Sequence, residues 1–188
     1  GGEEGAGIGG GALGTGDVTI EGNVTIENAQ GGAGAAGIGG GAETDPDTED
    51  TRNKVSIKST EAGSPNITAT GGGVLNNEDA PLAGAAAIGS GSVADGATEV
   101  KSDITIEGKV TIDATAGGSI AKGDAIAIGD TPLQEKKFAG LPVGAVITRK
   151  DSDGVDLTQE GDKPTEPEKP EPEPEKPDPE KPNPEQPS

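Results

Sequence analysis

The residues best suited to chemistry form an acidic turn near residue 150. Asp151, Asp153 and Asp156 stand at i, i+2 and i+5 around a glycine. Carboxylate oxygens at such spacing can surround a hard cation, which makes the turn a candidate calcium site. The bidentate glutamate that closes an EF-hand loop is missing from the twelfth position, since the nearest glutamate, Glu160, occupies the tenth. The pattern therefore favours an acidic flexible loop over a true calcium site.

Catalytic chemistry has little support in the residue types. The chain contains no histidine and no cysteine, which excludes disulfides, haem, zinc or iron sites that need these residues, and nucleophiles activated by histidine. Arg149 and Lys150 beside Asp151 and Asp153 form the one cluster that could serve a polysaccharide lyase or hydrolase. Because this cluster lies at the end of the repeat region rather than in a cleft, we expect a protein that is not an enzyme.

The charge balance excludes nucleic acid as a partner and disfavours anionic membrane surfaces. The 188 residues include 34 acidic and 14 basic side chains, which gives a net charge of −20. Binding to a phosphate backbone needs clustered lysine and arginine. No apolar run approaches the ~20 residues that span a bilayer, so membrane insertion is not expected.

An internal repeat organises residues 1–150. Three short segment types recur in a fixed order. The first type comprises residues 17–21, 54–58 and 103–107, the second 23–27, 66–70 and 109–113, and the third 5–9, 35–39, 85–89 and 125–129. Apolar residues alternate with polar or small ones in each segment, and glycine and β-branched residues dominate. This pattern predicts β-strands rather than helices.

Short strands, glycine turns and loops of variable length predict an all-β fold, a parallel β-helix of about three to four short coils. One coil cannot bury its own apolar side chains, but stacked coils can. Equivalent positions should therefore form inward columns with a spacing of about 4.8 Å. The expected columns are Ile8 with Ile38, Ile88 and Ile128; Val18 with Val55 and Ile104; Ile20 with Ile57 and Ile106; Val24 with Ile67 and Val110; and Ile26 with Ala69 and Ile112.

The outward positions of the first segment type carry charges that alternate from one repeat to the next. Like charges on adjacent strands repel, so a parallel ladder favours the order acid, base, acid. The expected outward columns are Asp17 with Lys54 and Asp103, and Glu21 with Lys58 and Glu107, together with Thr25, Thr68 and Thr111 on the second segment type. Exposed ion pairs stabilise a fold only weakly, so we expect these charges mainly to fix the register.

The third segment type has almost no side chains at its outward positions, which are 7, 37, 87 and 127 together with 9, 39, 89 and 129. One interpretation is that glycine and alanine permit sharp corners and close approach of the backbone. The other is a flat surface that packs against a protein or a planar ligand. The first is favoured, because exposed glycine and alanine do not make a large apolar patch.

Composition divides the chain into three regions. Residues 1–150 form the glycine-rich repeat, with a last strand expected at 145–148, and residues 151–162 form an acidic connecting loop. Residues 163–188 form a spacer, in which ten of the fifteen prolines lie between Pro164 and Pro187. Proline lacks the amide donor and restricts its predecessor to extended conformations. We therefore expect a disordered, extended tail.

Two motifs are shared with a known family. Ala-Gly-Ile-Gly-Gly-Gly occurs at Ala6 to Gly11 and at Ala36 to Gly41, between Val-Thr-Ile strands, and a Pro-Glu-Lys-rich spacer follows. The chain thus resembles the glycine-rich repeat regions of Gram-positive bacterial surface proteins, which carry wall-spanning spacers. The resemblance implies a right-handed parallel β-helix located outside the cell, at the cell surface or wall. No Leu-Pro-x-Thr-Gly sorting signal is found after the spacer, so attachment to the wall would need sequence beyond Ser188.

The expected function is a structural or adhesive surface module held away from the cell by its spacer. The alternative is a carbohydrate-binding module assisted by calcium, the one candidate cofactor. Because Phe138 is the sole aromatic residue, such a module would bind acidic polysaccharide through polar groups rather than by stacking. A polysaccharide-degrading enzyme is the third hypothesis. The partner would be a polysaccharide or a host or matrix protein.

Overall fold

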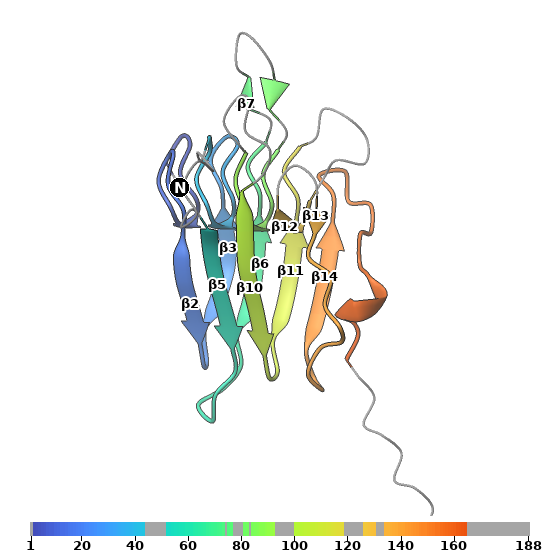
Figure 1. Cartoon of the computed structure of the whole chain (residues 1–188). Coiled ribbons are helices and arrows are strands. Elements are labelled where there is room, and N and C mark those ends of the chain that lie inside the picture. The colour runs from blue at the N-terminus through green and yellow to red at the C-terminus, as the bar shows by residue number, and fades with distance from the viewer. Residues whose placement is uncertain are drawn as a thin grey trace, which may run out of the picture.

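The computed structural model describes residues 2–43, 52–73, 75–76, 81–82, 84–92, 100–118, 126–130 and 134–164 (Figure 1). These residues form short β-strands, most of them in parallel pairs, and one short 3-10 helix at Glu160–Asp162 (η1). They contain no α-helix. The all-β class and the parallel pairing predicted from the sequence are confirmed.

Three sheets stand side by side, and successive repeats of the chain each add a strand to a sheet. Sheet A contains β1 (Ile8–Gly9), β4 (Ile38–Gly39), β9 (Ile88–Gly89), β12 (Ile128–Asp130) and the antiparallel β13 (Gln134–Glu135). Sheet B contains β2 (Asp17–Glu21), β5 (Arg52–Lys58) and β10 (Lys101–Glu107). Sheet C contains β3 (Thr25–Gln30), β6 (Asn66–Thr70), β11 (Thr111–Thr115) and β14 (Val146–Lys150). A separate antiparallel pair joins β7 (Leu75–Asn76) to β8 (Pro81–Leu82). The strands of one repeat are called a rung, so that β1, β2 and β3 make the first rung.

Sheet A pairs the residues that the repeat alignment brings together. Ile8 pairs with Ile38, Ile38 with Ile88, and Ile88 with Ile128. The three isoleucines after the first are fully buried. This expected column is therefore confirmed.

Sheet B also has the expected register. Ile57 of β5 pairs with Ile20 on one side and with Ile106 on the other. The other columns follow the same alignment: Val18 with Val55 and Ile104, Asp17 with Lys54 and Asp103, and Glu21 with Lys58 and Glu107. The apolar columns belong to the core of the molecule. Apolar side chains of similar size stack on one another in each column, which favours close packing between rungs.

The end positions of a column in sheet B are less covered than its centre. Ile57 is fully buried, whereas Ile106 of β10 is 9% exposed and Ile20 of β2 is 7% exposed. Ile106 nevertheless belongs to the same core cluster as Ile57. The small difference arises because Ile106 and Ile20 each pair with a strand of sheet B on one side only.

Sheet C has a register that differs from the expected one by two residues. Ile67 pairs with Ile26 and Ile112 rather than with Val24 and Val110. The three columns expected in this sheet are therefore wrong in their β6 member, namely Ile67 with Val24 and Val110, Ala69 with Ile26 and Ile112, and Thr68 with Thr25 and Thr111. The other two members of a column keep the expected alignment: Ile26 and Ile112 both pair with Ile67, and Thr25 and Thr111 both pair with Asn66. A shift of two residues leaves every side chain on its original face, and it stacks isoleucine on isoleucine and alanine on alanine.

A β-bulge in β3 also allows alanine to stack on alanine in sheet C. A β-bulge between Ile26 and Ala29 brings Ala29 opposite Ala69. The expected last strand of the repeat is present as β14, which pairs with β11. Sheet C therefore extends through four rungs.

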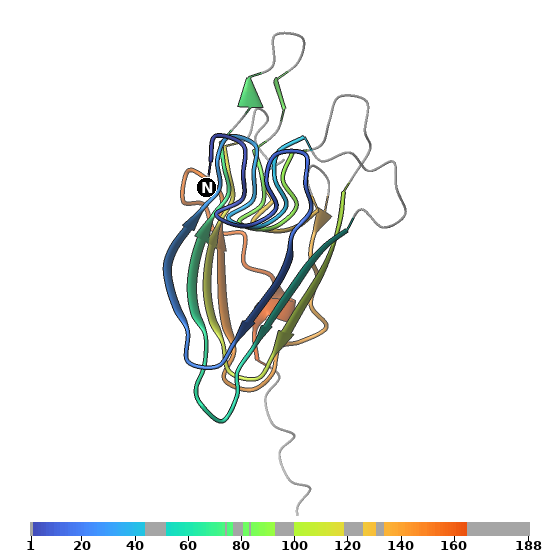
Figure 2. The same cartoon turned by 90° about the vertical axis from the view of Figure 1, so that its left-hand side faces the viewer.

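The glycine-rich strands of the second, third and fourth rungs are buried, whereas that of the first rung is partly exposed. The interpretation as a flat exposed surface is therefore wrong for the later rungs. Ala87 and Ala127 are fully buried, and the segments of successive rungs wind over one another (Figure 2). Gly39 has a φ of +131°, and a Cβ on it would lie 2.0 Å from the carbonyl oxygen of Gly89. Backbone packs directly on backbone here, which only residues with little or no side chain allow.

One buried amide links the rungs at the start of sheet B. Asn53 is fully buried, and its Oδ1 accepts a hydrogen bond from the backbone N–H of Gly16 at 3.0 Å. Its Nδ2 donates to the Ser102 hydroxyl oxygen at 3.5 Å. The side chain thus connects three rungs, and a buried polar group needs such partners to be tolerated.

The folded part of the chain extends beyond residue 150. Residues 151–164 turn back onto the last rung, where Lys150 bridges to Asp156 and Leu141 bridges to Pro164, and Leu157 packs against the core. The expected boundaries, with a repeat region ending at 150 and a connecting loop at 151–162, stay predictions. The expected spacer lies outside the described residues from position 165 onward. Within the described residues, no helix has the length and apolarity needed to cross a membrane.

Candidate functional site

The outward side of sheet B presents the most regular array of polar side chains. Exposure alternates along β2 and β10, with every second residue buried. The outward residues, called the ladder face below, are Asp17, Thr19, Glu21, Arg52, Lys54, Ser56, Lys58, Lys101, Asp103, Thr105 and Glu107. The ladder face therefore combines two columns of alternating charge, a central column of hydroxyl groups and the basic pair Arg52 and Lys101.

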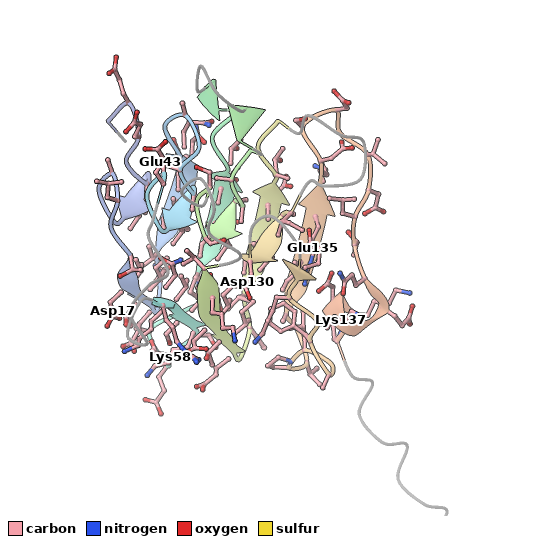
Figure 3. All side chains as sticks on the ribbon, turned by 45° about the horizontal axis from the view of Figure 1, so that its top comes forward. Asp17, Glu43, Lys58, Asp130, Glu135 and Lys137 are labelled. Atoms are coloured by element: carbon pink, nitrogen blue, oxygen red, sulfur yellow. The ribbon has the colours of Figure 1, made fainter. Side chains whose placement is uncertain are left out.

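Ion pairs join neighbouring strands of the ladder face. The Nζ of Lys58 lies 2.8 Å from Glu21 Oε1, and Arg52 Nη1 lies 3.5 Å from Asp103 Oδ1. The hydrogen bond from Lys58 to Glu21 raises the pKa of the lysine, and the charges of Glu21 and Glu107 add to this effect. Lys58 and Asp17 project on the same side of the molecule (Figure 3). The acids on either side thus favour the charged form of the middle lysine.

A shallow hollow lies on this face. Its polar lining consists of Asp17, Lys54, Ser56, Asp103 and Thr105. Ammonium, carboxylate and hydroxyl groups within one hollow offer both donors and acceptors of hydrogen bonds. The lining contains no aromatic ring, so a ligand would be held by polar contacts.

We expect Lys58→Glu to lower the midpoint of thermal unfolding by a few degrees, because the new carboxylate lies between Glu21 and Glu107. Circular dichroism measures the effect. Lys101→Glu is the matched control, since position 101 pairs with Arg52 and the new carboxylate meets a base. Equal losses in the two variants would contradict the ladder.

The acidic turn does not gather its carboxylates in one place. Asp151 Oδ1 accepts hydrogen bonds from the backbone N–H groups of Asp153 at 2.9 Å and Val155 at 2.7 Å. Asp156 Oδ1 accepts from the backbone N–H of Thr158, and hydrogen bonds from this threonine lower the pKa of Asp156. Among the described residues, no three acidic side chains form a group that could hold a metal ion. Two of the three aspartates instead stabilise the turn itself.

The cluster expected to serve a lyase is dispersed. Lys150 points outward and pairs with Asp113 at 3.3 Å. Arg149 is completely buried and stands opposite Ala114 of β11, at an inward position. The basic and acidic groups of this cluster therefore do not face a common space. The inward position of Arg149 could have been predicted, because it lies two residues after the inward Ile147.

Arg149 is the centre of a buried polar cluster, called the arginine cap below, that closes the last rung. Its guanidinium donates to a carboxylate oxygen of Glu135, to the carbonyl of Lys136 at 2.8 Å and to Asp162 Oδ1 at 2.7 Å. The ring of Phe138 lies 5.4 Å from the guanidinium carbon. These contacts join β13, β14 and η1, so the arginine cap is a structural element.

Glu135 has a second role in the arginine cap. Its carboxylate accepts hydrogen bonds from the backbone N–H groups of Ala127 at 2.5 Å and Ile128 at 3.2 Å. Burial raises the pKa of Glu135, while these hydrogen bonds and Arg149 oppose the rise. The glutamate thus supplies hydrogen-bond acceptors to the backbone N–H groups at the start of β12, the last parallel strand of sheet A.

No protein-family model matches the chain, and searches of curated proteins and of solved structures gave no match.

Proposed function

We propose that the chain is a non-catalytic structural and adhesive module of a bacterial cell surface, built as a right-handed parallel β-helix. The observation that carries the proposal is the in-register stacking of repeated strands, with apolar columns inside and the ladder face outside. Such stacking makes a stiff scaffold whose outer face presents polar groups in register at each rung. A scaffold of this kind suits display better than chemistry.

The proposed location is the Gram-positive cell surface or wall. The glycine-rich motifs and the proline-rich sequence after residue 163 support it. Labelling of intact producing cells with an antibody against the repeat region tests this location, and staining only after cell lysis would contradict it.

Adhesion is expected to use the ladder face. Immobilised protein should retain an acidic or neutral polysaccharide, or a matrix protein such as collagen, and Ser56→Gln should weaken retention by at least about tenfold because it fills the hollow. Thr68→Gln is the matched control, since Thr68 is equally half-buried but belongs to sheet C. Equal effects of both substitutions would exclude the ladder face, and no retention of any ligand would leave only the structural role.

A calcium-assisted carbohydrate-binding module is the second candidate. The polar, ring-free lining of the hollow favours it. In this case retention of acidic polysaccharide should need millimolar calcium and disappear with a chelator. Asp151→Asn should then weaken retention as well. Retention that a chelator leaves unchanged would contradict the role of calcium.

A further inference from the structure

The first rung ends the stack with an open strand edge. In the described part of the chain, β2 pairs with β5 on one side and with no strand on the other. Val18 and Ile20 remain 8% and 7% exposed, while Val55 and Ile57 beneath them are 1% and 0% exposed. The apolar column of sheet B is therefore less completely covered at this end than in its centre.

The backbone of β2 is oriented to accept another strand. The carbonyl of Gly16 accepts from Lys54, and the N–H of Gly22 donates to Lys58, so even-numbered residues bond to β5. Backbone groups alternate in direction along a strand. Those of Asp17, Thr19 and Glu21 therefore point to the open edge. The neighbouring edge strand β3 is interrupted by its bulge, whereas β2 is regular.

The opposite edge of sheet B, at β10, differs in what lies beyond it. Ile106 is 9% exposed there, which is close to the value for Ile20 at the β2 edge. The chain continues past β10 into a last rung, however, whose Phe138 and Leu141 pack against the core. Among the described residues, no strand pairs with the outer side of β2, and this edge is the docking position considered for an added strand.

The charges on β2 select the strand that can bind there. The first and last residues of β2, Asp17 and Glu21, face outward and carry carboxylates. The neighbouring strand β5 presents Lys54 and Lys58 at the paired positions. Asp17 forms no ion pair with the described residues around it, and Glu21 pairs on its inner side with Lys58. A strand with a basic residue at each end would repeat this pairing on the free side.

A second copy of the chain is a poor occupant of this edge. Stacking β2 on β10 of another copy, the arrangement that would continue the ladder, places acids against acids in both charged columns, because β10 carries Asp103 and Glu107. Pairing β2 with β2 also places acids together. Carboxylates at sheet edges are a known protection against self-association.

We propose that the β2 edge binds an extended polypeptide strand with the pattern basic, apolar, polar, apolar, basic, by parallel strand addition. The sequence of β5 is the template for this partner, since β5 pairs with two acidic strands of the same pattern. Backbone hydrogen bonds supply the attraction, and the two charges supply the register. The site shares Asp17 with the hollow of the ladder face, but it uses the backbone edge of β2 rather than the hollow, so it does not depend on the proposed function.

The test uses the whole chain and a labelled peptide, Asn-Lys-Val-Ser-Ile-Lys-Ser, which repeats residues 53–59. Fluorescence anisotropy should show binding at least about tenfold tighter than for Lys-Lys-Ser-Asn-Ser-Val-Ile, which has the same composition without alternation. The scrambled peptide is necessary because the net charge of −20 attracts any cation. Amide shifts in the nuclear magnetic resonance spectrum should appear at β2.

Variants at the two sheet edges complete the test. The double variant Asp17→Asn with Glu21→Gln should weaken peptide binding by about tenfold, and the control Asp103→Asn with Glu107→Gln on β10 should leave it unchanged. Equal binding of the two peptides would overturn the proposal. So would a loss confined to the β10 variant, or sedimentation showing that a second copy occupies the edge. Because the peptide comparison uses the unaltered protein, a variant that fails to fold leaves the test intact.

Discussion

Gly41→Ala is expected to cost the fold at least about 3 kcal/mol, the upper end of the cost of overpacking. A Cβ at this position would lie 1.9 Å from the carbonyl oxygen of Gly11 and 2.6 Å from its carbonyl carbon. These atoms belong to the backbone of the first rung, and Gly41 is itself tied to that rung by a hydrogen bond from its N–H to Gly14. Neither segment can move away without separating the two rungs.

Gly11→Ala is the matched control. Gly11 occupies the same place in the first Ala-Gly-Ile-Gly-Gly-Gly motif that Gly41 occupies in the second, but a Cβ there has nothing within 4 Å. We expect a change within about 0.5 kcal/mol. Because the chain has no Trp or Tyr, unfolding is best followed by far-ultraviolet circular dichroism. Equal stability of the two variants would mean that the glycine segments are not stacked in contact.

The sequence alone was sufficient for sheets A and B, because their repeats are nearly identical and have a single sensible alignment. Ile38 has a counterpart in every rung, and the acid–base alternation around Lys58 gives an independent check on register. Sheet C was less determined. Its segments fit together with or without a shift of two residues, since both choices keep isoleucine inward. The bulge after Ile26 and the match of Ala29 to Ala69 depend on packing against other rungs.

The glycine segments and the arginine cap show two other limits of pattern reasoning. Alternation identifies which positions face inward only where side chains differ, and at Gly37 or Gly39 there is no side chain to compare. Their burial follows from contacts with rungs 50 residues away, such as that of Gly39 with Gly89. The buried position of Arg149 was missed for the opposite reason. The alternation along its strand places Arg149 inward, but a charged residue is normally expected at the surface unless its partners are known. One of those partners, Asp162, becomes a neighbour only when residues 151–164 fold back.

Arg149→Met is expected to destabilise the chain by about 3–5 kcal/mol, because removing one partner of a buried ion pair leaves the other charge without compensation. The side chain of Asp162 is fully buried and that of Glu135 is 17% exposed. Methionine fills much of the same volume, so the loss reports mainly on charge. Lys150→Met is the control. Lys150 and Asp113 are 40% and 46% exposed, and we expect a change below about 1 kcal/mol.

The cause of that loss can be separated from loss of packing by neutralising the acids. If unpaired carboxylates are responsible, adding Glu135→Gln and Asp162→Asn to Arg149→Met should recover a substantial part of the stability, because no buried charge then remains in the arginine cap. Hydrogen exchange locates the effect: the amides of Leu157 and Asp162, which bond to Arg149 and Gln159, should exchange faster in the single variant than those of β5. A triple variant as unstable as the single one would show instead that the hydrogen bonds from the Arg149 guanidinium to the backbone carbonyls of Ile128 and Lys136 hold the last rung closed.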